Sequence, residues 1–169
     1  PDAKAAGEHK VLPAATGRAA FVTSNWWKET REQYKGFGDP SPELLNMLKK
    51  RSETAAALGR LSPWLLQQAK NEQADPNLPK VNLLFSAKPG AGSAVAMWEV
   101  KGDVWEIQYL PANTMLTGMA DAQLALVLHL ANEAKAAGTS LKLAPLVIPT
   151  LFADLKDFGF DEMTLQYND

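Results

Sequence analysis

The sequence contains no cysteine, which excludes disulfide bonds, thiol catalysis and thiolate metal ligands. Only two histidines occur, His9 and His129, and no clustered carboxylates accompany them, so we expect no metal site. No apolar run approaches the roughly 20 residues that a membrane-spanning helix needs. We interpret His129 as a packing histidine and assign no role to His9.

The chain also lacks a strong charge of either sign. Its 17 Lys and Arg residues and 19 Asp and Glu residues give a formal net charge of −2, so no basic field favours nucleic acid. The short basic run 49–51 is typical of a solvated helix face. With 169 residues, 46% of them hydrophobic, the chain is long enough for one domain with its own core.

No signal peptide is visible, and the first residue is Pro1 rather than Met. We therefore expect a chain that is processed, trimmed or cut from a larger parent protein, and a homodimer stays open. Cysteine-free chains occur on both sides of a membrane, and the cytoplasm is our working prediction.

Hydrophobic periodicity and Gly/Pro breaks divide the chain into an expected flexible N-terminal arm, 1–16, and a single domain, 17–169. Within the domain we predict helices over 26–34, 42–58, 63–71, 121–137 and 149–158, and strands over 18–23, 81–86, 94–100, 104–110, 141–143 and 160–167. Tight turns predict antiparallel hairpins, and the strand–helix–strand passage 104–144 predicts a parallel crossover. The fold class is thus α/β (α+β): a mixed, mostly antiparallel sheet with helices on both faces.

The passage from the strand 104–110 into the long helix is the best place to look for a function. Free backbone N–H groups and the helix dipole make the N-terminus of a helix a ready anion site. The segment between them reads Met115-Leu116-Thr117-Gly118-Met119-Ala120.

This segment resembles the acyl-CoA motif Gln/Arg-x-x-Gly-x-Gly/Ala of the GCN5-related N-acetyltransferase (GNAT) family. Gly118 and Ala120 keep the family's spacing, whereas Met115 replaces Gln/Arg. The element order is also similar to that of the family, as is the C-terminal layout of Leu141-Lys142-Leu143 followed by Phe158-Gly159-Phe160.

The resemblance implies acetyl-CoA or another acyl-CoA as cofactor. Backbone N–H groups of Leu116, Thr117, Gly118, Met119 and Ala120 would hold the pyrophosphate. The backbone of Leu110 would pair with the pantetheine arm, in a slot formed where the strands 104–110 and 141–143 splay apart.

The resemblance also implies an N-acyltransferase that moves an acetyl group to a small-molecule or peptide amine. Glu106 is the implied general base, with Glu99 as substitute; the alternative is a solvent-facing strand carboxylate. Trp26, Trp27 and Tyr34, with Trp64, would line the acceptor site, although core packing is the preferred interpretation for at least two of these four aromatic residues.

Two departures favour another class of function. Leu155 stands where the family often has a proton-donating Tyr, and Ile148 where it often has Asn. An aliphatic side chain cannot give a proton. The alternative is a non-catalytic GNAT-fold module with a binding, regulatory or effector role, and a third reading is an α/β domain whose likeness to the family is accidental.

Overall fold

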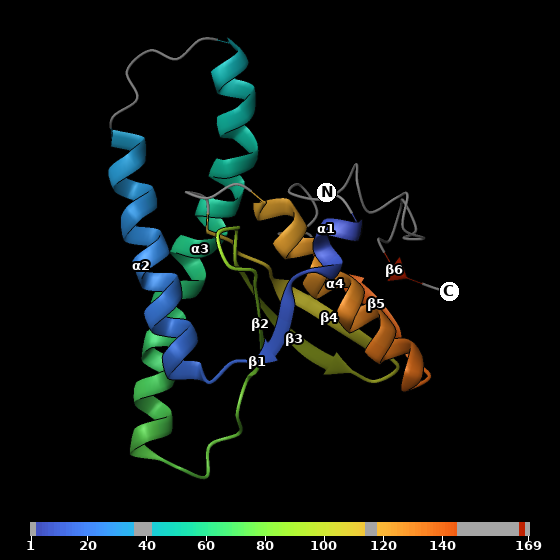
Figure 1. Ribbon diagram of the computed structural model, residues 1–169. Coiled ribbons are helices and arrows are strands. Elements are labelled where there is room, and N and C mark those ends of the chain that lie inside the picture. Colours follow the sequence, from blue (N-terminus) through green and yellow to red (C-terminus); the bar gives the residue numbers. More distant parts are fainter. Residues whose placement is uncertain (1–2, 36–41, 114–117, 145–165, 168–169) are drawn as a thin grey trace.

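The computed structural model describes residues 3–35, 42–113, 118–144 and 166–167 (Figure 1). The predicted helix 149–158 lies outside these residues, as do most of the predicted last strand and the residues Met115, Leu116, Thr117, Ile148 and Leu155.

The described residues form helices and strands in an order close to the predicted one. The helices are α1 (Ala3–Gly7), α2 (Thr16–Lys35), α3 (Pro42–Ala74) and α4 (Met119–Ala136). The strands are β1 (Lys10–Pro13), β2 (Asn82–Ala87), β3 (Ala94–Lys101), β4 (Val104–Tyr109), β5 (Ser140–Leu143) and β6 (Gln166–Tyr167).

The six strands form one sheet in the order β1-β2-β3-β4-β5-β6. Neighbouring strands are antiparallel except β4 and β5, which are parallel and joined through α4. The predicted hairpins and the parallel crossover are therefore confirmed, and the fold is a mixed α+β arrangement.

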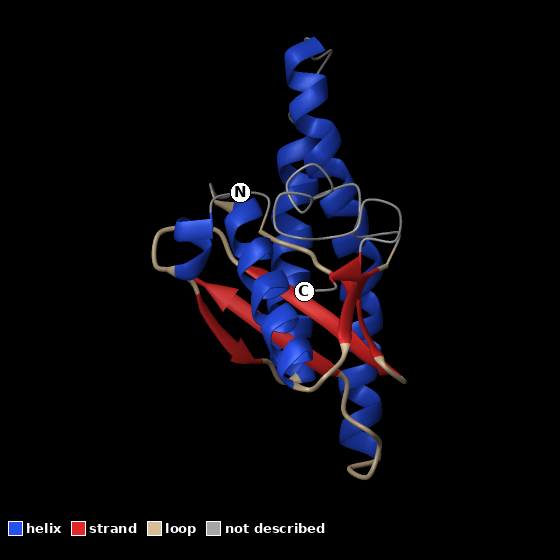
Figure 2. Ribbon diagram, turned by 90° about the vertical axis from the view of Figure 1, so that its right-hand side faces the viewer, coloured by secondary structure: helices blue, strands red, loops and turns tan. Residues whose placement is uncertain are grey.

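Helices cover both faces of this sheet, as Figure 1 and Figure 2 show. Strand β3 explains why, because its consecutive side chains point to opposite faces. Ala94 and Ala96 belong to the core under α4 and α1, whereas Val95 and Met97 belong to the core under α2 and α3. The first half of β3 is apolar and buried on both faces, as expected for a strand between two helical layers. Burying one leucine side chain in such a core contributes about 1.5–3 kcal/mol.

The structure corrects the expectation of an N-terminal arm. In its place lie α1 and β1, and β1 pairs along its whole length with Leu84–Ala87 of β2 at one edge of the sheet. Part of the segment expected to be a flexible arm is therefore an edge strand of the sheet.

Two predicted elements are also wrong. Residues 18–23, predicted as a strand, lie in α2, where Ala19 and Ala20 are buried and the Thr23 hydroxyl donates to the Ala19 carbonyl over 2.6 Å. The predicted break before Pro63 is absent, because α3 continues through it. A proline inside a helix removes one backbone hydrogen bond, and the burial of Leu61 and Leu65 on either side stabilises the continuous form.

No helix among the described residues is both long and apolar enough to cross a membrane.

Candidate functional site

The N-terminus of α4 lies at the end of the β4 connection, where the anion site was predicted. Gly118 is the N-cap residue and has φ 81° and ψ 14°, in the left-handed region that favours glycine. No side chain caps this end within the described part of the chain. Met119 and Ala120 follow and are half-buried. The first-turn N–H groups of a helix have no partner inside the helix, so this end can accept an anion. Asp121 in the same turn adds a negative charge that opposes one.

The loop between β2 and β3 packs directly against this helix end. A Cβ atom on Gly92 would lie 2.8 Å from both the carbonyl carbon of Gly118 and the nitrogen of Met119. Only a glycine in this loop permits such an approach, so the loop forms one wall of the site.

His9 holds this loop in place. Its side chain is buried, with Nε2 at 3.2 Å from the Gly92 carbonyl oxygen and Nδ1 at 3.0 Å from the Ala5 carbonyl oxygen. Carbonyl oxygens only accept, so both contacts are hydrogen bonds at the same time only when both ring nitrogens carry a proton. No local pattern indicated this role, because His9 and Gly92 are far apart in the chain.

Leu110, at the end of β4, is buried, and its carbonyl oxygen already has a partner. The side chain of Gln123, which has no exposed surface, donates to it from Nε2 over 2.7 Å. That carbonyl is therefore engaged within the protein. The predicted pairing with a pantetheine arm would have to use the N–H group of Leu110 or replace this bond.

The slot predicted between the parallel strands β4 and β5 is closed along the whole length of β5. Val104–Ile107 pair with Ser140–Leu143, and the Ala144 N–H donates to the Ile107 carbonyl over 2.9 Å. Strand β4 runs on beyond this ladder. Its register with β3 shifts between Met97 and Trp98, so Gln108 is the extra residue of a bulge. Among the described residues, the pairing of β4 with β5 thus ends at Ile107 and does not include Gln108 or Tyr109.

Glu106 is not the free strand carboxylate considered as an alternative. Its side chain is only 15% exposed, and Oε1 lies 3.0 Å from Lys101 Nζ. Glu99 lies opposite Glu106 in the sheet, with an oxygen 3.9 Å from the same Nζ. The hydrogen bond from Lys101 to Glu106 and the negative charges of Glu106 and Glu99 raise the pKa of Lys101. Gln108 Nε2 donates over 2.5 Å to Glu99 Oε2, the same oxygen that faces Lys101.

The predicted acceptor-site aromatics occupy different positions. Trp26 is buried and stacks on Phe85 with ring centroids 6.1 Å apart, so it is part of the core. Trp27 is half-buried, and the Arg31 guanidinium lies 5.4 Å from its ring centroid. The side chain of Tyr34 is outside the described part. Core packing thus accounts for Trp26, whereas Trp27 retains some exposed surface.

His129 is half-exposed rather than packed in the core, with Nε2 at 3.9 Å from Glu133 Oε1 one turn further on. Within the described ranges no three His, Asp or Glu side chains are grouped so that they could hold a metal ion.

Comparison of the chain with protein-family models, curated proteins and solved structures gave no match.

Proposed function

We propose that this domain binds acetyl-CoA or another acyl-CoA where β4 ends and α4 begins, and that it transfers the acyl group to an amine. The pyrophosphate would lie on the first-turn N–H groups of α4, from Gly118 to Ala120. The element order β1-α2-α3-β2-β3-β4-α4-β5, with β4 and β5 parallel, supports the proposal because it agrees with the order that the GNAT resemblance implies.

The observation that carries the proposal is the uncapped start of α4 at a left-handed glycine. Most helices use a Ser, Thr, Asp or Asn side chain to satisfy a first-turn N–H group. Here a glycine occupies that position, and no side chain of the described residues caps the first-turn N–H groups, although the Gly92 loop packs against the nitrogen of Met119. Because the donors belong to the main chain, the site needs no arginine or lysine.

The proposed transfer is a direct attack. The amine nitrogen bonds to the thioester carbonyl carbon, the carbon–sulfur bond then breaks, and the thiolate of CoA leaves. Glu106 takes the proton of the amine through a water molecule, at the carboxylate oxygen that does not contact Lys101. The products are an amide and CoA.

A second candidate is a module that binds acyl-CoA and does not transfer the acyl group. The contact between Lys101 and Glu106 favours it, because this contact occupies one of the two carboxylate oxygens. Leu155, in place of a proton-donating residue, agrees with this candidate.

Thermal unfolding followed by a turnover assay tests both candidates. We expect acetyl-CoA to raise the midpoint of unfolding, since a ligand that binds only the folded state stabilises it. Release of free thiol in the presence of a panel of amines would then support transfer, and stabilisation without thiol release would support the binding module. If neither acetyl-CoA nor any longer acyl-CoA changes the midpoint, both candidates are wrong.

A further inference from the structure

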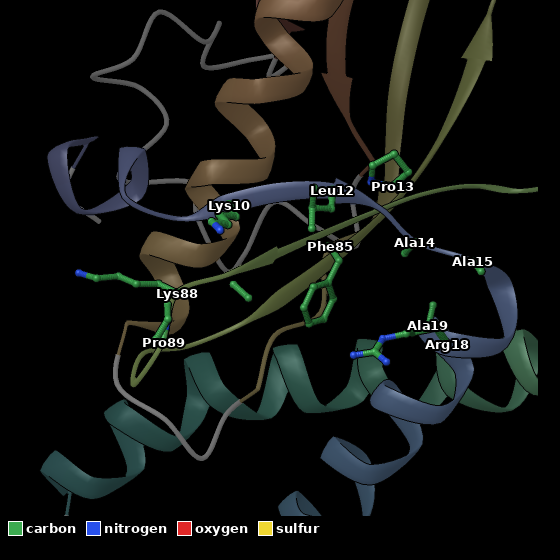
Figure 3. Close-up of a pocket in the computed structure, with 11 residues that line it drawn as sticks. Lys10, Leu12, Pro13, Ala14, Ala15, Arg18, Ala19, Phe85, Lys88 and Pro89 are labelled. Atoms are coloured by element: carbon green, nitrogen blue, oxygen red, sulfur yellow. The ribbon is translucent and has the colours of Figure 1, made fainter.

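A cavity lies where β1, the end of β2 and the first turn of α2 meet, and no residue of α4 lines it (Figure 3). Its volume is about 770 Å³, within the range of sites for small molecules. Its walls are apolar and come from Leu12, Pro13, Ala14, Ala15, Ala19, Phe85, Ala87 and Pro89. Of these residues only Pro89 lies in the β2–β3 loop that borders the start of α4.

The polar groups that line this cavity are all cations: Lys10, Arg18 and Lys88. Lys88 forms an ion pair with Glu8, and Figure 3 shows its amine pointing away from the other two. Lys10 and Arg18 are exposed and form no ion pair with any residue that the structure describes. No Asp or Glu lines the cavity. Two unpaired positive charges therefore stand beside an apolar wall.

We infer that this cavity binds a small amphiphilic carboxylate, with an apolar body and a single negative charge. The planar guanidinium of Arg18 can bind a carboxylate through two parallel hydrogen bonds. Lys10 lies toward the opposite end of the cavity, beyond Leu12 and Phe85, and contributes positive potential at longer range (Figure 3). The apolar body would lie against Phe85 and Leu12. Burial of apolar surface supplies affinity, and the charged end fixes the orientation.

The chemistry of the walls separates this ligand from other anions. A sugar phosphate or an oligonucleotide would present many hydroxyl and phosphate groups, and the lining side chains offer no neutral polar partner for them. A neutral apolar molecule would make no hydrogen bond to the guanidinium of Arg18. An apolar molecule with one carboxylate satisfies both features.

Titration of the whole chain with octanoate, followed by calorimetry, tests the inference. Trp26 gives a second readout, because it stacks on the Phe85 ring that lines the cavity. We expect octanoate to bind at least about tenfold more tightly than octanol, which lacks the charge, or acetate, which lacks the chain. A hydrogen bond to a charged group contributes about 1.5–3 kcal/mol, which corresponds to roughly tenfold or more in affinity.

Matched variants locate the site. Arg18→Gln and Lys10→Gln should each weaken octanoate binding, by about tenfold or more for Arg18. Lys28→Gln, on the same helix as Arg18 and exposed, should leave the affinity unchanged. Circular dichroism and thermal unfolding check that all three variants fold. Arg18 is exposed, so loss of folding is not expected.

Two results would overturn the inference: octanol binding as tightly as octanoate, or Arg18→Gln binding octanoate like the wild type. Vesicles of phosphatidylglycerol form a separate arm. Sedimentation with vesicles that depends on Arg18, without any binding of free octanoate, would show that the cavity region contacts a lipid surface and would contradict a small-molecule site. Since the residues differ from those at α4, acetyl-CoA should not compete with octanoate, and failure of one proposal leaves the other standing.

Discussion

Gly92 and Gly118 are in backbone contact, although they belong to different connections of the sheet. Their contact joins the loop between β2 and β3 to the N-cap residue of α4. The position of the proposed anion site is therefore set by a loop on one side and a helix on the other.

Gly92→Ala should destabilise the fold and weaken acetyl-CoA binding. The new methyl group would lie 2.8 Å from backbone atoms of Gly118 and Met119, so the start of α4 must shift. Overpacking of this kind costs about 1–3 kcal/mol. Urea unfolding and calorimetry would measure the two effects. Gly17→Ala is the control, because a Cβ atom there meets nothing within 4 Å, and its stability should be equal or slightly higher. Wild-type values for Gly92→Ala would show that the loop does not position α4.

Gly118→Ala should cost about 1–2 kcal/mol of unfolding free energy for a different reason. The space beside Gly118 is open to a Cβ atom, whose nearest neighbour would be 3.5 Å away, but φ is 81°. Residues other than glycine adopt this conformation at a cost of about 1–2 kcal/mol, and Asn tolerates it better. Gly118→Asn should therefore be more stable than Gly118→Ala in chemical unfolding. Equal losses for the two variants would point to steric contact in place of backbone strain.

His9→Leu should lower the unfolding free energy by about 1–3 kcal/mol. The change keeps an apolar volume but removes both contacts to the carbonyls of Ala5 and Gly92, which are then left without that partner. His129→Leu is the matched control, because its ring is half-exposed and lies 3.9 Å from the carboxylate of Glu133. Thermal unfolding of the two variants side by side is the measurement. A loss in His129→Leu as large as that in His9→Leu would contradict this role for His9.

Stability at high pH should depend on Lys101. Its pKa is raised in the folded state, chiefly by the hydrogen bond from Lys101 to Glu106. A raised pKa of a cationic group contributes stability that is fully present below pH 10.5 and is lost as the pH rises through the folded-state value. The midpoint temperature of unfolding should therefore fall more steeply above pH 10.5 in the wild type than in Lys101→Met. Lys28→Met should follow the wild type. Parallel pH profiles for wild type and Lys101→Met would refute the linkage.

Glu106→Gln should abolish most acyl transfer while acetyl-CoA still binds. Loss of a general base typically lowers kcat by about 10²–10⁴-fold. Glu99→Gln is the control on the neighbouring strand, where the carboxylate is 56% exposed, and it should change kcat little. Steady-state thiol release gives kcat, and calorimetry gives the affinity. Unchanged turnover in Glu106→Gln would remove this residue from the mechanism.

Much of the sheet was predictable because its strands obey simple local rules. The apolar runs of β2, β3 and β4 are separated by glycine turns, and Gly102 has the positive φ that a tight hairpin requires. The apolar spacing in α4 and the glycine at 138 that follows it predicted the crossover helix within two residues.

The start of α2 was mispredicted because short apolar runs do not distinguish a strand from a helix. Phe21 and Val22 suggested a strand, whereas packing of Ala19 and Ala20 on the core determined a helix. Pro63 in α3 is a similar case, in which tertiary packing outweighs a local breaking signal.

The contacts around the candidate site could not be predicted from local patterns. His9 meets Gly92, and Gln123 meets the Leu110 carbonyl, across gaps in sequence that only the assembled fold closes. Both acceptors are main-chain carbonyl groups, which every residue has, so no sequence motif predicts these contacts. The same holds for the cavity at Arg18, whose lining comes from three elements.

Amide chemical shifts in a ¹⁵N-labelled sample titrated with acetyl-CoA give the most direct test of the proposed site. If the helix end holds the pyrophosphate, the largest changes should fall on Gly118, Met119 and Ala120, with Gly92 affected as their neighbour. Spectra that do not change, or changes confined to other parts of the chain, would show that the start of α4 is not an acyl-CoA site.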